Sequence, residues 1–273
     1  MQKIGSRNLK ISSDRLMHIA EKLYNEGIIS YPRTETDVFS TNFHLRPLIE
    51  KQTFDDTWGA YATQLLQGGF RHPRAGKNND EAHPPIHPVR AANNLTGDEK
   101  KLYDFIARRF LACVSHDAKG HETKVFVDIA NEEFHAKGLV ILERNYLDIY
   151  PFENWNASNI APFSVGDTIL ADIALKQGET SKPTLLTEAD LIGLMDKSGI
   201  GTDATIHEHI KKILERDYAN KDGDYFVPTV LGMSLVSGYD KMEIDISLSK
   251  PELRALVISL IPLFSNHTRW NKT

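Results

Sequence analysis

Apolar residues recur with a helical period through most of the first 115 residues. The clearest pattern is SSDRLMHIAEKLYNEG, residues 12–27, in which apolar side chains fall three and four positions apart from Leu16 onward. Ser12 or Ser13 can cap the start of this helix, and Gly27 suits its end. A second strong helix is predicted by TGDEKKLYDFIARRFLACV, in which a threonine is followed three residues later by a glutamate. Weaker helical patterns cover 41–52 and 57–67.

The pattern changes to that of strands between about residues 121 and 180. The segments 122–130, 132–143 and 167–179 alternate apolar and polar residues or are rich in valine, isoleucine and phenylalanine. These three segments predict a small sheet.

A third region follows the predicted sheet and returns to helices. Thr187 and Asp190 form a cap pair for a helix that Gly199 ends, and we expect a second helix to start at Thr202. The segment YANKDGDYFVPT, residues 218–229, predicts a hairpin that turns at its central Asp-Gly pair. Helices followed by a hairpin are typical of a winged-helix-like module. The predicted fold class is therefore α+β with several domains.

Composition places the chain among globular proteins, with 41% hydrophobic and 25% charged residues. No run approaches the roughly 18 to 20 apolar residues that span a membrane, and the first 30 residues carry charges throughout. We therefore expect an intracellular protein without a membrane segment. The single cysteine, Cys113, excludes an internal disulfide and a cysteine-rich zinc site within this chain.

Charge is distributed unevenly along the chain. The net charge of -5 argues against binding nucleic acid by bulk charge alone. Residues 71–124 nevertheless hold ten Lys/Arg against seven Asp/Glu, while the segment beyond 124 is acidic. A basic stripe of this size is either a solvated face or a track for phosphates.

The segment GIISYPRTETDVF places a tyrosine, a proline and an arginine directly after the first strong helix. Pro32 favours an extended backbone, in which Tyr31 and Arg33 project from the same face. A phenol needs a neighbouring cation or base to become a good nucleophile, and a guanidinium suits a phosphate oxygen. A half-buried strand tyrosine beside a surface arginine fits the same spacing. Thr34 and Thr36 either add contacts to an anion or cap the next helix.

The segment NDEAHPPIHPVR holds two histidines in a proline-rich loop. His83 and His87 lie four residues apart, as in a helical zinc site, but Pro84 and Pro85 forbid the helix, so we expect no metal site. One of these histidines can meet a phosphate as hydrogen-bond donor or proton carrier. The alternative is a rigid loop with solvated imidazoles.

The segment KSGIGTDAT places glycines 199 and 201 before a predicted helix. Such turns aim backbone N–H groups and the positive end of the helix dipole at an anion, although an ordinary helix-turn-helix explains the pattern about as well. The Asp-Gly-Asp at 222–224 lies in a predicted hairpin turn, so we interpret it as turn chemistry and not as a Mg²⁺ site.

Four motifs in order carry a resemblance to a known family. AEKLYNEGIISYPRTETD, EAHPPIHPV, ILERNYLDIYPFENW and LIGLMDKSGIGTDATIHEHI resemble the type IA DNA topoisomerases, and among these the eukaryotic-type DNA topoisomerase III proteins. The similarity covers nearly all of residues 6–245, and four long motifs in the family's order are very specific.

The resemblance implies roles for individual residues. Tyr31 matches the catalytic tyrosine, which attacks a phosphodiester of single-stranded DNA and becomes a 5'-phosphotyrosine, Arg33 matches the arginine that positions the scissile phosphate, and His83 matches the active-site histidine. GIGTDAT matches a DNA-binding turn, so the candidates for contact with the strand are Gly199, Gly201, Thr202 and Thr205.

The resemblance also implies a domain order. It predicts a helical domain carrying the tyrosine at 1–117, a β-rich arch domain at 118–182, and an incomplete, helical, winged-helix-like DNA-binding domain at 183–273. The family holds Mg²⁺ in a Toprim domain that has no counterpart in this sequence, and its zinc-binding tail is absent as well. We therefore expect a fragment that does not bind Mg²⁺ itself and is inactive alone in relaxing negative supercoils.

The partners and the location follow from the family alone. The resemblance implies a RecQ-type helicase and an OB-fold accessory protein as partners, and a nuclear location. The alternative is a non-catalytic module that binds single strands or a partner protein and retains the tyrosine as an inheritance. Formation of a covalent adduct with DNA distinguishes the two hypotheses.

Overall fold

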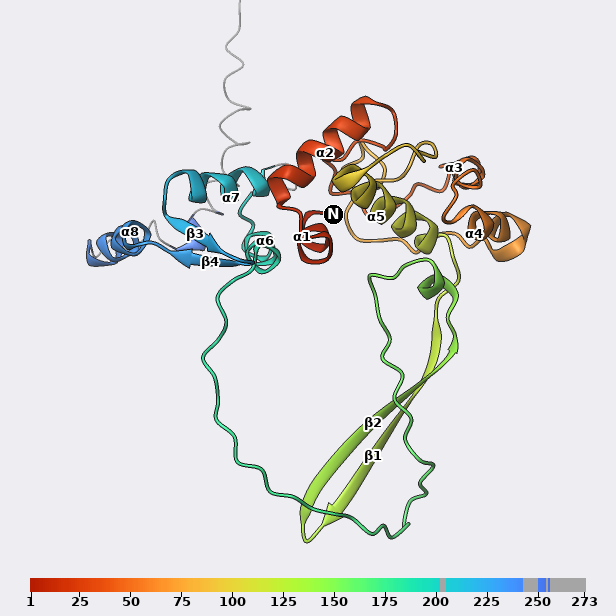
Figure 1. Cartoon of the computed structure of the whole chain (residues 1–273), viewed down its shortest axis with the longest axis vertical. Helices are drawn as coiled ribbons and strands as arrows, with labels where there is room; N and C mark the ends of the chain where they lie inside the picture. Colours follow the sequence, from red (N-terminus) through yellow and green to blue (C-terminus); the bar gives the residue numbers. More distant parts are fainter. Residues whose placement is uncertain (202–204, 243–249, 254, 256–273) are drawn as a thin grey trace, which may run out of the picture. The chain divides into compact units, whose positions relative to one another are not determined.

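The computed structural model describes residues 1–201, 205–242, 250–253 and 255 (Figure 1). In chain order its elements are α1 (Gln2–Leu9), α2 (Ser13–Asn25), α3 (Arg46–Gln52), α4 (Gly59–Gln64), a π-helical turn (Leu65–Gly69), α5 (Gly97–Cys113), β1 (Lys119–Ile129), β2 (Glu132–Glu143), a 3-10 turn (Asn145–Asp148), α6 (Glu188–Lys197), α7 (Ile206–Glu215), β3 (Ala219–Asp222), β4 (Tyr225–Pro228) and α8 (Val230–Lys241). Within the described residues, no helix combines the length and the apolar character needed to cross a membrane.

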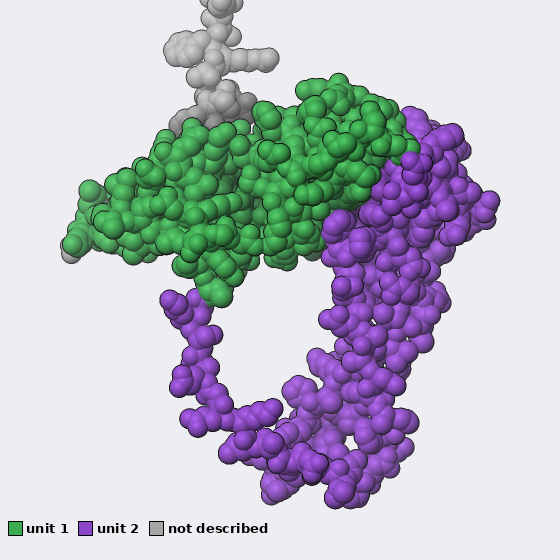
Figure 2. All heavy atoms as spheres, viewed as in Figure 1, with its two compact units in different colours: residues 1–41, 75–105, 184–273 green, residues 42–74, 106–183 purple. Residues whose placement is uncertain are grey.

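The chain divides into two compact units, coloured separately in Figure 2. The first unit contains residues 1–41, 75–105 and 184–273, and the second contains 42–74 and 106–183. The division passes through α5, so the helical stretch expected at 1–117 contributes to both units. The family-based domain boundaries at 117 and 182 stay a prediction.

The first unit is built around α2. This helix packs against α1 and α7, and α1 packs against α6. Gly5 lets α1 and α2 approach closely, because a Cβ at this position would lie 2.2 Å from Cδ1 of Leu16 and would force that side chain to shift. The side chains buried in this unit include Leu16, Met17, Leu23, Ile28, Ile29, Leu102 and Tyr103.

The structure confirms the predicted cap of α6. The side chains of Thr187 and Asp190 each accept a hydrogen bond from the other's backbone N–H, and Gly199 follows the helix with φ of +66°. Among the described residues α7 begins at Ile206 with Thr205 at its N-cap position, and the helix start expected at Thr202 stays a prediction. Gly201, with φ of +79°, keeps the preceding turn out of helical geometry. Residue 202 itself lies outside the described residues.

A short hairpin and a small core complete this part of the first unit. Strands β3 and β4 pair antiparallel, with Asp222 opposite Tyr225 and Gly223 in the turn, as the sequence predicts. The core beneath them is formed by Ile192, Met195, Ile206, Ile210, Ala219 and Phe226.

The second unit combines α3, α4 and the long hairpin β1–β2. Trp58 is fully buried at the start of α4, and its Nε1 donates to Oε1 of Gln52 at 3.1 Å. The hairpin is antiparallel and turns at Ala130 and Asn131, both of which have positive φ. Backbone hydrogen bonds between Leu139 and Ser158 attach the following chain to the hairpin.

The strand predicted at 167–179 is wrong. These residues belong to neither sheet, and Leu170 and Leu175 are fully exposed. An alternating pattern forms a strand only where a neighbouring edge offers hydrogen bonds and one face is covered. Neither condition is met by the described residues around this segment.

Candidate active site

Helix α2 determines where Tyr31 lies. Ser12 accepts a hydrogen bond from the N–H of Arg15 at the start of the helix. At its end Gly27 adopts φ of +68°, and the N–H of Ile28 donates to the carbonyl of Leu23 at 2.9 Å. A positive φ of this kind reverses the chain at little cost only for glycine. The chain therefore leaves α2 sharply, and four residues after the turn it reaches Tyr31.

The segment before Tyr31 pairs with the proline-rich loop. Ser30 donates from its N–H to the carbonyl of His87 at 2.9 Å, and Val89 donates to the carbonyl of Ile28 at 2.8 Å. The N–H of His87 donates to Oγ of Ser30 at 2.9 Å. These bonds connect residues about 60 positions apart, and they bring the histidine loop alongside the tyrosine.

Tyr31 lies between two aromatic side chains. The ring of His83 stacks on it with 4.4 Å between centroids and 28° between planes. Tyr24, from the last turn of α2, meets it edge-on at 5.4 Å. The phenol is half-buried and its ring is held on two sides, so the predicted nucleophile and the predicted histidine are brought together.

The two histidines of the loop have different environments. His87 is buried, its Nδ1 lies 2.7 Å from the carbonyl oxygen of Pro85, and burial lowers the pKa of its imidazole. His83 is half-buried and contacts Tyr31. The structure thus separates a structural histidine from one that can take part in chemistry.

Thr34 and Thr36 both bind Asp80 of the histidine loop, one through its carboxylate and the other through its backbone N–H. Both are buried, and Oγ1 of Thr34 donates to Oδ2 of Asp80 at 2.8 Å. Oγ1 of Thr36 accepts the N–H of Asp80 at 3.0 Å. The next helix, α3, begins only at Arg46, so neither threonine caps it. The hydroxyls instead fix the loop that carries His83.

The guanidinium of Arg33 is held by acidic side chains. Its Nε and Nη2 lie 2.6 and 2.5 Å from Oε1 of Glu21 on α2. Its Nη1 lies 3.8 Å from Oε1 of Glu208 on α7. Because a quarter of the arginine side chain is exposed, an incoming anion can reach it by replacing a carboxylate.

Helix α7 brings a further group to the arginine. His207 is buried, and burial together with the nearby charge of Arg33 lowers the pKa of its imidazole. Lys211, one turn further along α7, lies 3.3 Å from Asp14 on α2. The start of α7 therefore lies next to Arg33 and within the same compact unit as Tyr31.

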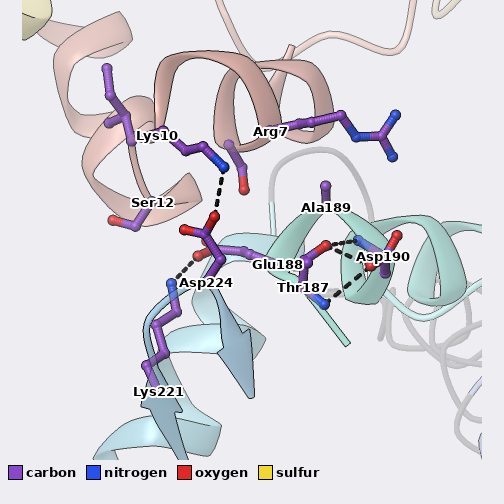
Figure 3. Close-up of a pocket in the computed structure, with 11 residues that line it drawn as sticks. Arg7, Lys10, Ser12, Thr187, Glu188, Ala189, Asp190, Lys221 and Asp224 are labelled. Carbon is purple, nitrogen blue, oxygen red and sulfur yellow. Dashed lines mark hydrogen bonds and ion pairs between the residues drawn. The ribbon is translucent and has the colours of Figure 1, made fainter. Parts of the chain in front are cut away.

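A polar cleft in the first unit is lined by residues of α1, the start of α6 and the β3–β4 hairpin (Figure 3). Glu188 is buried there, and its Oε1 accepts the N–H and Oγ–H of Ser13 at 2.6 and 2.5 Å. Its Oε2 forms an ion pair with Lys221 of β3. Lys10 and Asp224 make a second, exposed pair at 2.6 Å. Since Ser13 begins α2, these contacts align α2 with α6 and the hairpin.

The sequence located some of these residues and missed others. Tyr31 and His83 are in contact, while Gly199 and Gly201 occupy the turn before α7. The predicted common face of Tyr31 and Arg33 stays a prediction, and Thr202 lies outside the described residues. The missed partners include three carboxylates, those of Glu21, Asp80 and Glu208. Of these three, only Asp80 could have been identified from the local sequence, because an aspartate three residues before a histidine can accept the backbone N–H of that histidine.

The described residues do not fit a metal site. Among them, no group of three or more histidines, cysteines and carboxylates is arranged to hold a metal ion. The chemistry available from this part of the chain is that of a phenol, an imidazole beside it, and a guanidinium that can exchange a carboxylate for a phosphate.

Comparison with known proteins places the site in context. A family model described as DNA topoisomerase matches residues 1–260. The chain is 53% identical over 257 residues to DNA topoisomerase 3-alpha of Drosophila melanogaster and 52% identical over 257 residues to that of Homo sapiens. It is 47% identical over 263 residues to DNA topoisomerase 3 of Candidozyma auris.

These matches cover 93% of this chain but only 20%, 26% and 41% of the three relatives. The chain thus spans a fifth to about two fifths of their length. Among solved structures, full-length topoisomerase I from Thermotoga maritima matches 94% of this chain and 43% of its own, with a TM-score of 0.70 and 22% identity. At that identity the match shows a shared fold.

Proposed function

The chain belongs to the type IA DNA topoisomerase family, and from that membership we propose that it carries the tyrosine half of a site that cleaves and rejoins single-stranded DNA. Tyr31 is the nucleophile of this proposal. The observation that supports it most directly is that the ring of Tyr31 stacks on His83, with 4.4 Å between centroids. Arg33 follows Tyr31 by two residues in the sequence.

The proposed cleavage is a phosphoryl transfer to the phenol. Oη of Tyr31 attacks phosphorus, the bond from phosphorus to the 3' oxygen breaks, and the downstream piece of the strand stays on the tyrosine through its 5' phosphate. The phenol proton leaves as the new bond forms, and the 3' oxygen gains a proton. Attack by that hydroxyl reverses each step and rejoins the strand, so no energy source is consumed.

His83 and Arg33 have separate roles in this proposal. His83, in contact with the ring of Tyr31, exchanges the proton with a reacting oxygen. Arg33 binds the phosphate after the phosphate has replaced Glu21, because a guanidinium forms paired hydrogen bonds with phosphate as it does with carboxylate. The positive charge then offsets the charge that develops on phosphorus oxygens.

The turn before α7 is the proposed contact for the adjoining strand. Gly199 and Gly201 have positive φ, and Thr205 stands at the N-cap position of a ten-residue helix. Backbone N–H groups at a helix start suit a phosphate. Thr202 belongs to the same proposal on the basis of the motif alone.

Mg²⁺ and the partners belong to the proposal for the whole protein. The described residues do not fit a metal, so on family membership alone we assign Mg²⁺ to the Toprim domain of the whole protein and derive no step through it. We propose that the described residues do not relax supercoils by themselves, since they hold no acidic cluster that could supply the electrostatic contribution of a metal ion. A RecQ-type helicase, an OB-fold accessory protein and a nuclear location rest on family membership only.

Covalent trapping tests the proposal. The chain is mixed with single-stranded DNA labelled at its 3' end, with Mg²⁺, in the presence and absence of a separately made Toprim domain, and then denatured. We expect labelled protein that survives denaturant and requires the added domain. The label must be at the 3' end because the downstream piece stays on the protein.

Two variants of neighbouring tyrosines identify the nucleophile. Tyr31→Phe should abolish the adduct, whereas Tyr24→Phe, which changes the ring that meets Tyr31 edge-on, should retain it. An adduct that persists in Tyr31→Phe contradicts the proposal. DNA binding without any adduct, with the Toprim domain present, favours a non-catalytic strand-binding module instead.

A further inference from the structure

Asp80 connects the tyrosine segment to the histidine loop. Its Oδ1 accepts the backbone N–H groups of Ala82 and His83 at 3.0 and 2.8 Å. Its Oδ2 accepts the hydroxyl of Thr34 at 2.8 Å and lies 3.4 Å from Nδ1 of His83. One carboxylate thus faces the backbone, the hydroxyl and the imidazole of the proposed site.

The contacts keep this carboxylate ionised. The backbone N–H of His83 and, after it, the hydroxyls of Thr34 and Thr36 hold the pKa of Asp80 well below its usual range. An ionised carboxylate accepts hydrogen bonds only. Its imidazole neighbour must therefore present a proton toward it to make a favourable contact.

We propose that Asp80 is a positioning residue that orients the ring of His83 and keeps a proton on its Nδ1. The carboxylate lies at one edge of the imidazole and Tyr31 stacks on its face, so both the position and the tautomer are fixed. A carboxylate on one ring nitrogen determines what the other nitrogen can do. Nε2 is left as the atom that exchanges a proton with a reacting oxygen.

This inference rests on the proposed function only in the role that it gives to Nε2, the exchange of a proton with a reacting oxygen. The geometry itself is a property of the folded chain and can be tested without catalysis. The other loop histidine supplies an internal reference, because Nδ1 of His87 lies 2.7 Å from the carbonyl oxygen of Pro85.

Nitrogen NMR of the full chain, labelled at its histidines, tests the tautomer. At about pH 8 we expect His83 to show two well-separated ring nitrogen shifts with the proton on Nδ1. Asp80→Asn should move both shifts toward the average of the two tautomers or exchange them. Asp37→Asn is the matched control, because Asp37 accepts the N–H of Asn78 in the same region and should leave His83 unchanged.

A second pair of variants covers the case in which Asp80→Asn loosens the loop and shifts His87 as well. Asp80→Glu and Asp80→Gln have the same size and differ only in charge. The separated pattern of His83 should persist with glutamate and be lost with glutamine. The same pattern in both variants, or a proton on Nε2 in the unmodified chain, overturns the inference.

The rate of adduct formation, measured with the Toprim domain present, distinguishes a positioning role of Asp80 from a merely structural one. Asp80→Asn should lower the rate about tenfold or more, as expected for loss of an oriented acid or base. In a His83→Ala background the same change should have no further effect, since residues that act as one unit are not additive. A further loss in that background overturns the inference, whereas an adduct in Tyr31→Phe overturns the proposed function and leaves the NMR result standing.

Discussion

The phosphate contact proposed for Arg33 has to compete with the acidic residues that hold the guanidinium. Glu21 takes both Nε and Nη2, and Glu208 lies near Nη1. The carboxylates keep the guanidinium in place before DNA arrives, and they also repel the phosphates that it is proposed to bind. Under the proposed function, the affinity for DNA at this residue is therefore the difference between its interaction with phosphate and its interaction with the carboxylates.

Replacement of Glu21 should strengthen strand binding. Glu21→Gln removes one negative charge beside the arginine, so we expect about three- to tenfold tighter binding of a short single strand at about 50 mM salt and a smaller gain at about 200 mM. Fluorescence anisotropy with labelled DNA measures both. Glu26→Gln, which changes the same charge at the end of the same helix, should have little effect, and an equal gain there would mean that only net charge matters.

Buried histidines should make the first unit sensitive to acid. Burial lowers the pKa of His87 and of His207 below the ordinary 6.5. The unfolded chain then binds protons that the folded chain does not, so the free energy of unfolding falls as pH drops below about 6.5. Urea denaturation at several pH values should show that the free energy of unfolding falls less steeply with acid in His87→Gln. The fall that remains in this variant is expected from His207. His18→Gln, at an exposed position of α2, should keep the full slope.

At the scale of elements, the sequence predicted correctly those features that depend on neighbouring residues alone. The end of α2 at Gly27, the cap of α6 and the β3–β4 turn depend on residues within a few positions of each other. The strand expected at 167–179 depends on a neighbouring edge, and its own residues carry no information about that edge. In the same way the motif revealed Tyr31 and His83, whereas Glu21 and Glu208 reach Arg33 through packing of α2 and α7.

The buried pair at Glu188 should control the attachment of α6 and β3 to α2. Glu188→Ala leaves the start of α2 and Lys221 without their partner, so we expect the free energy of unfolding of the first unit to fall by about 2–3 kcal/mol. Asp224→Ala, which breaks the exposed pair in the same cleft (Figure 3), should change it by about 0.5 kcal/mol or less. Equal losses in chemical denaturation would show that burial of the carboxylate is not the cause.

At the scale of the whole chain, the first unit is assembled from distant segments. Residues 1–41 and 75–105 belong to the same unit as the part after 184, although residues 106–183 separate them in sequence. The segment after the long hairpin, 161–183, has no helix or strand and exposes Val165, Leu170 and Leu175. A protease needs such an extended, accessible backbone.

Limited digestion with chymotrypsin should therefore cut first between residues 161 and 183. We expect two fragments on a denaturing gel and a single particle on a native sizing column, because α1 with α6 and α2 with α7 remain packed across the cut. In Glu188→Ala the nicked chain should separate more readily, since the buried contact to Ser13 is lost. Fragments that part at once in the unmodified chain would show that these helix contacts do not hold the unit together, and that continuity of the chain does.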